Sequence, residues 1–233
     1  MRVFAFTLDI DWATEEVIYE ITKIFSEHKI KCTLFCTHKS DVLSNIDAKL
    51  FEIALHPNYN SIFGNKPESI HNTFDKLHSI FPQARGVRAH SGTQSSVLSE
   101  FYVSRGIKYE SNIISPYCSH LKPFKLWNGL YRIPFNWEDD VHYLYGHSFK
   151  NCKMNLSNRY LIFNFHPIHI YLNTENEERY KSAKEFYHYT SKLKPFINTS
   201  EIKGTKDLLL DLMMYVKRNN IKAYKLSEII KHY

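Results

Sequence analysis

Short apolar runs of strand length alternate with segments of helical periodicity along almost the whole chain, and this alternation restricts the fold more than any other feature. The runs VFAFTL (3–8), CTLFC (32–36) and YLIFNF (160–165) are rich in aromatic and branched residues and predict buried strands. Residues 14–28 and 205–219 place apolar side chains on one helical face. Strands that alternate with helices are typical of an α/β protein with a largely parallel sheet.

The remaining elements follow the same alternation. Further strands are predicted at 51–55, 86–90, 107–113, 130–134 and 141–145, and further helices at 67–81, where Pro67 opens the pattern, and at 95–105. No linker or repeat of fixed period divides the 233 residues. We therefore predict one α/β domain over residues 1–233, with about seven strands, and we favour a barrel, closed or incomplete, over an open sheet.

Charge and targeting signals exclude several classes of protein. The formal net charge is +6, but the basic residues are scattered and no nucleic-acid motif occurs. We expect no nucleic-acid partner, and at most a weak attraction for phosphate-bearing ligands. No run approaches the ~18 apolar residues of a transmembrane helix. The N-terminal segment lacks the apolar core of a signal peptide, so we expect a cytoplasmic protein without a transmembrane segment.

Polar side chains follow five of the predicted strands. In a parallel barrel the functional residues gather where strands end, at the carboxyl-terminal face. The residues in question are Asp9 and Asp11 after the first strand, His56 after 51–55, Arg88 and His90 at the strand near 87, Glu138, Asp139 and Asp140 after 130–134, and His166 and His169 after 160–165. We expect these side chains to form one site.

Such a set of residues supports metal-assisted hydrolysis. One carboxylate and two imidazoles hold a zinc-like ion and leave coordination positions open. The ion polarises a carbonyl oxygen and lowers the pKa of water. A second carboxylate would remove the proton of the water, and a separate histidine would protonate the leaving amine.

The order of these motifs resembles the polysaccharide deacetylase family, also called the NodB homology domain or carbohydrate esterase family four. The motifs are Thr7-Leu8-Asp9-Ile10-Asp11, His56, Arg88, Trp137-Glu138-Asp139 and His166, and they extend over nearly the whole chain. The resemblance implies a distorted (β/α) barrel with about seven strands. It also implies metal-dependent removal of acetyl groups from N-acetylated sugars.

The resemblance also implies individual roles. Asp9 resembles the catalytic base, Asp11 and His56 resemble metal ligands, Arg88 resembles the arginine that tethers the base, Asp139 resembles the acid that supports the arginine or the catalytic histidine, and His166 resembles that catalytic histidine. We expect one divalent ion, most simply zinc. The expected partner is an N-acetylated sugar or glycoconjugate, such as a cell-envelope glycan precursor.

The chain departs from the family pattern at the third metal ligand. The family has a second histidine four residues after the first, where this chain has Asn60, and the family proline after the arginine is replaced in the run Arg88-Ala89-His90. Asparagine is a poor zinc ligand. We therefore predict His90 as the third ligand, with Asn60 or water as the alternative. His169 is either a substrate contact or a structural residue.

Three other functions stay open on the sequence. The substrate could be a small non-sugar amide such as an acetylated amine, the barrel could bind glycan or a partner without catalysis, or the metal could serve unrelated chemistry such as phosphoester hydrolysis. Five aromatic residues could stack on sugar rings or belong to the core: Trp12, Tyr59, Trp127, Phe135 and Trp137.

Overall fold

One curved, mostly parallel β-sheet organises the protein. The structure is a computed structural model that describes residues 2–60 and 69–233. In the described part of the chain the sheet has nine strands in the order β6-β7-β5-β4-β3-β2-β1-β9-β8. Their bounds are β1 (Val3–Asp9), β2 (Cys32–Cys36), β3 (Phe51–Leu55), β4 (Gly86–Val87), β5 (Tyr109–Glu110), β6 (Phe124–Lys125), β7 (Tyr131–Arg132), β8 (Trp137–Glu138) and β9 (Tyr160–Phe165).

The sheet curls into an open barrel. All neighbouring strands in it run parallel except β6, which pairs antiparallel with β7. The two edge strands, β6 and β8, stand at opposite ends of the strand order, so the barrel is not closed by pairing between them. The predicted distorted (β/α) barrel is confirmed. The strand count is nine rather than about seven, because the two-residue edge strands β6 and β8 lie outside the predicted runs.

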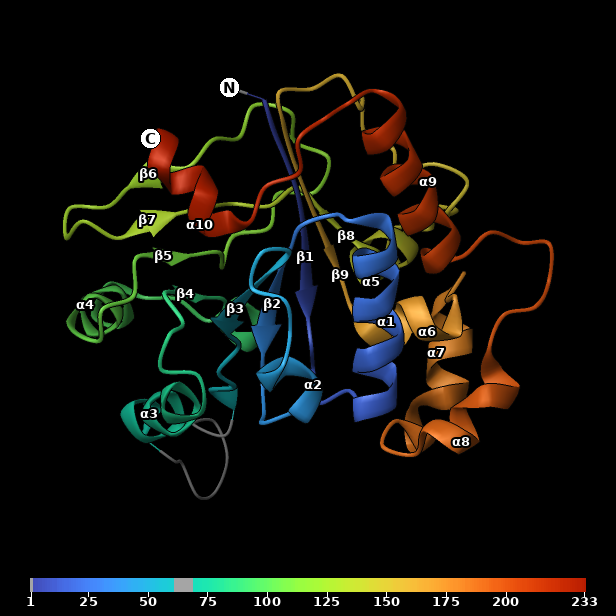
Figure 1. Ribbon diagram of the computed structural model, residues 1–233, viewed down its shortest axis with the longest axis horizontal. Coiled ribbons are helices and arrows are strands. Elements are labelled where there is room, and N and C mark those ends of the chain that lie inside the picture. The colour runs from blue at the N-terminus through green and yellow to red at the C-terminus, as the bar shows by residue number, and fades with distance from the viewer. Residues whose placement is uncertain (1, 61–68) are drawn as a thin grey trace.

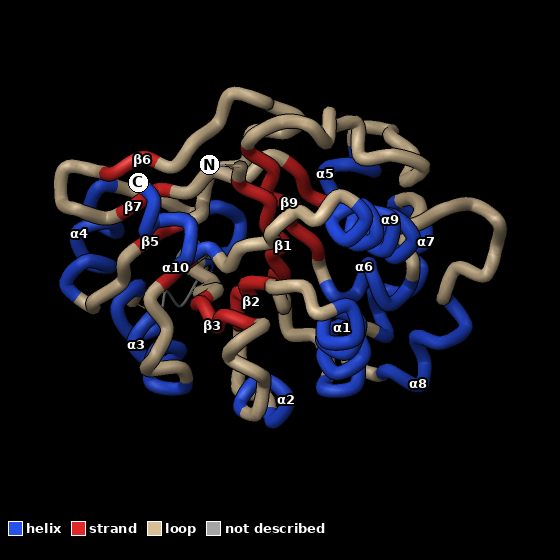
Figure 2. Tube along the Cα trace, turned by 45° about the horizontal axis from the view of Figure 1, so that its top comes forward, coloured by secondary structure: helices blue, strands red, loops and turns tan. Residues whose placement is uncertain are grey.

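Ten α-helices are found in the described residues. They are α1 (Glu15–His28), α2 (Asp41–Ser44), α3 (Ile70–Ile80), α4 (Ser96–Ser104), α5 (Asp139–Leu144), α6 (Pro167–Leu172), α7 (Glu177–Ala183), α8 (Thr190–Leu193), α9 (Thr205–Arg218) and α10 (Leu226–Ile229). Helices α1, α6 and α9 lie side by side on one flank of the sheet, and α3 and α4 lie on the other flank (Figure 1, Figure 2). No helix within residues 2–60 and 69–233 has both the length and the apolar composition needed to cross a bilayer.

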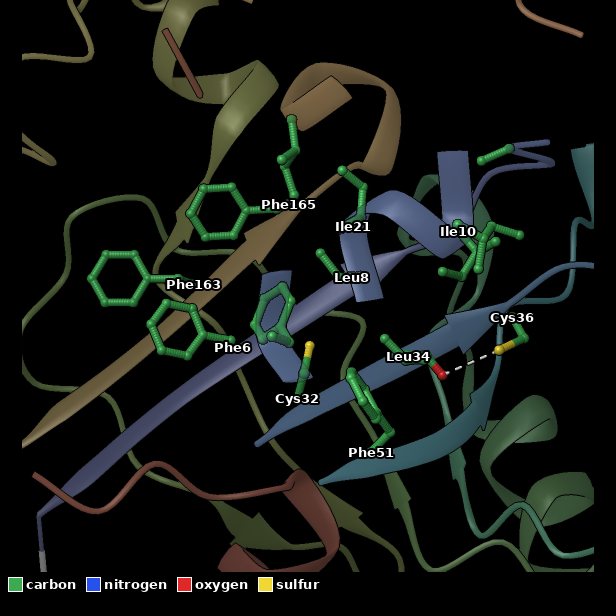
Figure 3. Close-up of a cluster of buried hydrophobic side chains, with 14 of the residues drawn as sticks. Phe6, Leu8, Ile10, Ile21, Cys32, Leu34, Cys36, Phe51, Phe163 and Phe165 are labelled. Atoms are coloured by element: carbon green, nitrogen blue, oxygen red, sulfur yellow. Dashed lines mark hydrogen bonds between the residues drawn. The ribbon is translucent and has the colours of Figure 1, made fainter. Parts of the chain in front are cut away.

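The outward face of the sheet forms the main hydrophobic core. Phe6 and Leu8 of β1 point outward, and so does Phe163 of the neighbouring β9. Figure 3 shows these side chains beneath α1, with Ile21 above Leu8. The N-cap of α1 is Thr14, whose hydroxyl accepts a hydrogen bond from the backbone of Val17, as expected for a helix that begins there.

The C-terminal segment fills the inward face of the barrel at the amino-terminal end of β1. Val3 and Ala5 point inward and form a second apolar cluster with Leu226 and Ile229 of α10. The buried carboxylate of Glu52 accepts a hydrogen bond of 3.0 Å from the backbone N–H of Ser227. Because this plug occupies the amino-terminal end of the barrel interior, the space for a site lies at the opposite end, at the carboxyl ends of the strands.

One predicted strand is wrong. Residues 141–144 belong to α5, which begins at Asp139, and Tyr145 caps the end of this helix. The two acids Asp139 and Asp140 occupy the first turn, where the helix dipole favours negative charge, and this outweighs the β-like composition of the apolar run. The predicted helix start at Pro67 lies outside the described residues, whereas Ile70–Ile80 is helical as expected.

Candidate active site

Strand periodicity brings the polar site residues onto the inward face. Successive side chains alternate between the two faces of a strand. Val3, Ala5, Thr7 and Asp9 therefore share the inward face of β1, with the apolar pair against the plug and the polar pair at the open end. The partner of Thr7 in β9 is Asn164. The site therefore occupies the polar half of the interior, at the carboxyl ends of the strands, whereas the half at their amino ends is apolar.

Asp9 and Arg88 form a buried ion pair at the centre of the site. Nη1 of Arg88 donates a hydrogen bond of 2.9 Å to Oδ1 of Asp9. Burial alone would raise the pKa of Asp9, but the charges of Arg88, His56 and His166 together outweigh burial, and the net effect is a pKa below the usual range. The guanidinium is held between the rings of Phe35 and Phe135, each 4.1 Å from its central carbon. Asp9 is therefore ionised and fixed in one orientation.

Asn164 connects this ion pair to the rest of the site, and the sequence analysis missed it. Its Oδ1 accepts hydrogen bonds from Arg88 and from Thr7 Oγ1, and its Nδ2 donates to Asp9 Oδ2 at 2.9 Å and to Glu138 Oε1 at 2.8 Å. The orientation of the amide is defined, because Arg88 can only donate. Strand alternation was the available signal, since Asn164 lies two residues before His166 in a predicted strand.

Asp11, His56 and His90 converge in a manner that fits a metal ion. Nε2 of His56 lies 3.1 Å from Oδ1 of Asp11, and Nδ1 of His90 lies 3.3 Å from both of these atoms. Nδ1 of His56 lies 2.6 Å from the backbone carbonyl of Arg88 and must donate to it, so Nε2 of the neutral ring carries a lone pair. Oδ1 of Asp11 is buried without a hydrogen-bond partner.

A carboxylate oxygen and two imidazole nitrogens that converge in this way form the arrangement that a divalent cation satisfies. The donor set of one carboxylate and two imidazoles suits zinc. His90 begins a short 3₁₀ turn, His90–Gly92, which directs its ring to Asp11. Asn60, the alternative third ligand, instead donates a hydrogen bond to Ser91 Oγ. The structure therefore brings His90, and not Asn60, into the cluster with Asp11 and His56.

His166 is paired with Asp139 rather than left free. Nδ1 of His166 lies 2.7 Å from Oδ1 of Asp139, and the backbone N–H of His166 donates to Oδ2 at 2.8 Å. Burial alone would lower the pKa of the imidazole, but the Asp139 carboxylate raises it well above its ordinary value. Asp139 therefore supports the histidine and not Arg88. Nε2 of His166 is left to face Asp11, 3.7 Å from Oδ2.

Glu138 adds a carboxyl group for which the sequence analysis assigned no role. It is half-buried and lines the same cavity as Asp9 and His166. Burial raises the pKa of Glu138 well above the usual range, with a further contribution from the charge of Asp140. Since Asp9 and Glu138 share one amide of Asn164, the site holds two carboxyl groups that favour opposite protonation states.

Two cavities meet at this cluster. The first, of about 400 Å³, contains Asp9, Arg88 and Glu138, and the second, of about 370 Å³, contains Trp12 and Tyr180. Residues common to both are Asp11, His90, Asp140 and His166. The candidate catalytic groups therefore lie between two spaces rather than at the bottom of one.

The aromatic residues separate into core and surface. Tyr59 and Trp137 are fully buried core residues, and Phe135 packs on Arg88. Trp127 is exposed and donates a hydrogen bond to Glu100, outside both cavity linings. Only Trp12 of the five is both exposed, at 37%, and part of a cavity wall.

His169 is buried behind the second cavity. Its Nδ1 lies 3.2 Å from Thr174 Oγ1, and its ring contacts the edge of Tyr180 at 4.7 Å between centroids. Burial lowers the pKa of His169 well below its usual value, so the ring is neutral. These contacts give His169 a structural place in the cavity wall.

The protein combines an open parallel barrel with a polar cluster at its mouth, which is the architecture of carbohydrate deacetylases. Comparison with known proteins agrees with this assignment. The profile of the family described as "WbmS-like: Polysaccharide deacetylase" matches residues 6–184. The structure of WbmS from Bordetella bronchiseptica, described as a candidate polysaccharide deacetylase involved in O-antigen biosynthesis, is 30% identical over 90% of this chain and 89% of that chain, with a TM-score of 0.82. This chain belongs to the WbmS-like polysaccharide deacetylase family.

More distant structures share the fold. The peptidoglycan N-acetylglucosamine deacetylase Bc1960 is 12% identical over 97% of this chain and 86% of that chain, with a TM-score of 0.56. A 4-α-glucanotransferase from Thermococcus litoralis is 11% identical over 99% of this chain but 38% of its own, with a TM-score of 0.50. Comparison with curated proteins gives no match.

Proposed function

We propose that this protein hydrolyses the acetamide group of an N-acetylated sugar within a glycan or glycoconjugate, with the help of a divalent metal ion. The observation that carries the proposal is the arrangement around Asp11. A fixed carboxylate, Asp9, and a paired imidazole, His166, line the same cavity as a three-residue cluster suited to a cation. Metal-assisted hydrolysis of an amide uses these three elements together.

Asp11, His56 and His90 would hold the ion. When bound, the ion would supply Lewis-acid polarisation of the acetamide carbonyl and would lower the pKa of water. The hydrogen bond from Nδ1 of His56 to the carbonyl of Arg88 fixes the ring orientation and leaves Nε2 as the nitrogen that would hold the ion. This contact also joins the metal ligands to the chain segment that carries the arginine.

Asp9 would act as the general base. It is ionised near neutral pH because Arg88 holds its pKa down. Its two oxygens accept from Arg88 and Asn164, so the carboxylate cannot rotate away. The proton of the attacking water passes to this carboxylate while oxygen bonds to the carbonyl carbon.

His166 would act as the general acid. The raised pKa keeps the imidazole protonated near neutral pH, and Asp139 leaves Nε2 as the only ring nitrogen directed to the cavity. As the C–N bond breaks, this proton passes to the sugar nitrogen, which leaves as an amine, while acetate retains the added oxygen. The intact Asp139–His166 and Arg88–Asp9 pairs argue against a barrel that binds glycan without catalysis.

An acetate-release assay tests this function. Purified protein with added zinc is offered N-acetylated monosaccharides, oligosaccharides, nucleotide sugars and acetylated polyamines. We expect acetate from sugars, loss of activity with chelator and recovery with zinc. Acetate from the polyamines alone would assign the hydrolase to non-sugar amides. No acetate from any substrate, with zinc bound stoichiometrically, would contradict the proposed function.

A further inference from the structure

The second cavity extends the site beyond the space that one acetamido group and its ring require. It shares Asp11 and His166 with the first cavity but is not lined by the base Asp9, and part of its wall comes from α7 and the 3₁₀ turn Lys184–Phe186. Because the candidate catalytic groups lie between the two cavities, a bound acetamido sugar in the first leaves the second free for the unit attached to it.

The wall of this second cavity is aromatic and fixed. The hydroxyl of Tyr187 donates a hydrogen bond of 2.6 Å to the backbone carbonyl of Asp11. The ring of Tyr180 rests on buried His169, and Trp12 contacts the ring of His90 edge-on at 5.4 Å. Rigid aromatic side chains with polar tips suit the faces and hydroxyls of a sugar ring.

The outer rim of the same cavity is basic. Lys184 and His188 are exposed and line it, at the end away from the base Asp9. Nζ of Lys184 lies 5.9 Å from the ring centroid of Tyr180, which keeps it over the aromatic wall. Within the described residues Lys184 makes no salt bridge, whereas Lys181, three residues earlier, pairs with Glu177 at 2.8 Å. The ammonium group of Lys184 is therefore available to a ligand.

We propose that the second cavity is a subsite for an anionic unit attached to the acetylated sugar, with a sugar carboxylate or a phosphate ester bound by Lys184 and His188 over the aromatic wall. This inference rests on the proposed function for the orientation of the substrate. It deepens that function by naming the substrate class, a negatively charged glycoconjugate rather than a neutral glycan.

Equilibrium binding to the zinc-loaded protein tests the subsite without requiring turnover. Calorimetry compares neutral N,N′-diacetylchitobiose with a disaccharide of N-acetylglucosamine and glucuronic acid, and with N-acetylglucosamine 1-phosphate. The wild-type protein should bind at least one anionic ligand more tightly than the neutral one. The carboxylate and phosphate arms distinguish the two sources of negative charge. Equal affinity for all three would overturn the proposal.

Variants locate the effect. Lys184→Met keeps the length of the side chain and should weaken anionic binding about fivefold, the size expected of a partly exposed charge pair, while leaving the neutral ligand unchanged. Lys184→Arg should retain the preference, and Lys181→Ala, outside the cavity, should change nothing. An equal loss for neutral and anionic ligands in Lys184→Met would count against the subsite. If the protein binds the anionic ligands more tightly but releases no acetate, that result would refute the proposed function and leave the subsite standing.

Discussion

The side-chain amide of Asn164 donates a hydrogen bond of 2.9 Å to the carboxylate of Asp9, across the pair of strands β1 and β9. The same amide accepts from the arginine that neutralises Asp9. The base is therefore oriented by a neutral group on one side and a cationic group on the other. This contact joins the first motif of the chain to the last, which lie far apart in the sequence.

Exchange of Asn164 for aspartate tests this contact. Asn164→Asp keeps the shape but places a third carboxyl group beside Asp9 and Glu138, so the pKa of Asp9 should rise. The base works only when ionised, and the acid limb of the kcat/KM profile should therefore move to higher pH. The surface variant Asn45→Asp should leave the profile unchanged. An unshifted acid limb would show that Asn164 has a purely structural role.

Removal of the proposed base should separate chemistry from metal binding. Asp9→Asn cannot take a proton, and general bases typically contribute about 10²–10⁴-fold. We expect kcat to fall by that factor and zinc content to stay close to that of the wild type, while thermal stability falls because Arg88 loses its buried counterion. Activity within a few-fold of wild type would mean that another group removes the proton.

Two alanine variants decide the third metal ligand. His90→Ala should lose stoichiometric zinc, because only Asp11 and His56 would be left to hold it. Asn60→Ala should keep zinc, since Asn60 contacts Ser91 instead. Elemental analysis after dialysis measures both. The reverse result would reassign the ligand set.

Neutralisation of Asp139 should change the alkaline side of the pH profile. In Asp139→Asn the charge that raises the pKa of His166 is lost, so that pKa falls. The acid must be protonated to act, and the alkaline limb of kcat should move to lower pH. The measurement is kcat against pH at saturating substrate. A profile identical to wild type would leave His166 without a role in proton donation.

His142, remote from the metal ligands, should contribute to the acid sensitivity of the fold. It is buried with Nδ1 next to the Tyr117 hydroxyl, and burial lowers its pKa from 6.5 to about 4. As pH falls from 6.5 to about 4, the unfolded chain takes up a proton that the folded protein does not, so stability present above pH 6.5 is progressively lost.

The variant His142→Gln should accordingly lose less melting temperature than the wild type between pH 7.5 and pH 5. Exposed His120→Gln serves as the matched control and should follow the wild type. Differential scanning calorimetry at the two pH values makes the comparison. Parallel losses in all three proteins would show that the protonation of His142 does not contribute.

The long, strongly patterned elements were predictable with their bounds. Of the two-residue strands, β4, β5 and β7 were predicted only as longer runs, and β6 and β8 were not predicted. β1, β9, α1 and α9 have the periodicity and capping that set their positions locally. The two-residue strands depend on tertiary pairing, which no local pattern reports. The strand predicted at 141–145 was wrong, because the strand-like composition of this run was given more weight than the two acids that precede it.

Part of the candidate site could likewise be predicted from the sequence, and part could not. The side chains directly after strand ends could be identified, because parallel topology gathers them at one face. Asn164 lies inside a strand, where composition suggests only core, and its contacts arise from cross-strand register. The cavity beside α7 depends on how a polar segment packs back onto the barrel, which sequence periodicity does not determine.

The plug formed by α10 has a consequence for how the protein is made. Leu226 and Ile229 cover the inner face of β1, yet the ribosome synthesises them after every strand of the sheet. Val3 and Ala5 cannot be covered by α10 until all nine strands of the described sheet have been synthesised. The hydrogen bonds that the backbone N–H groups of Leu226 and Ser227 donate to Thr33 and Glu52 likewise require this C-terminal segment. Final ordering of the barrel beneath the catalytic groups is thus a step that follows synthesis of the sheet.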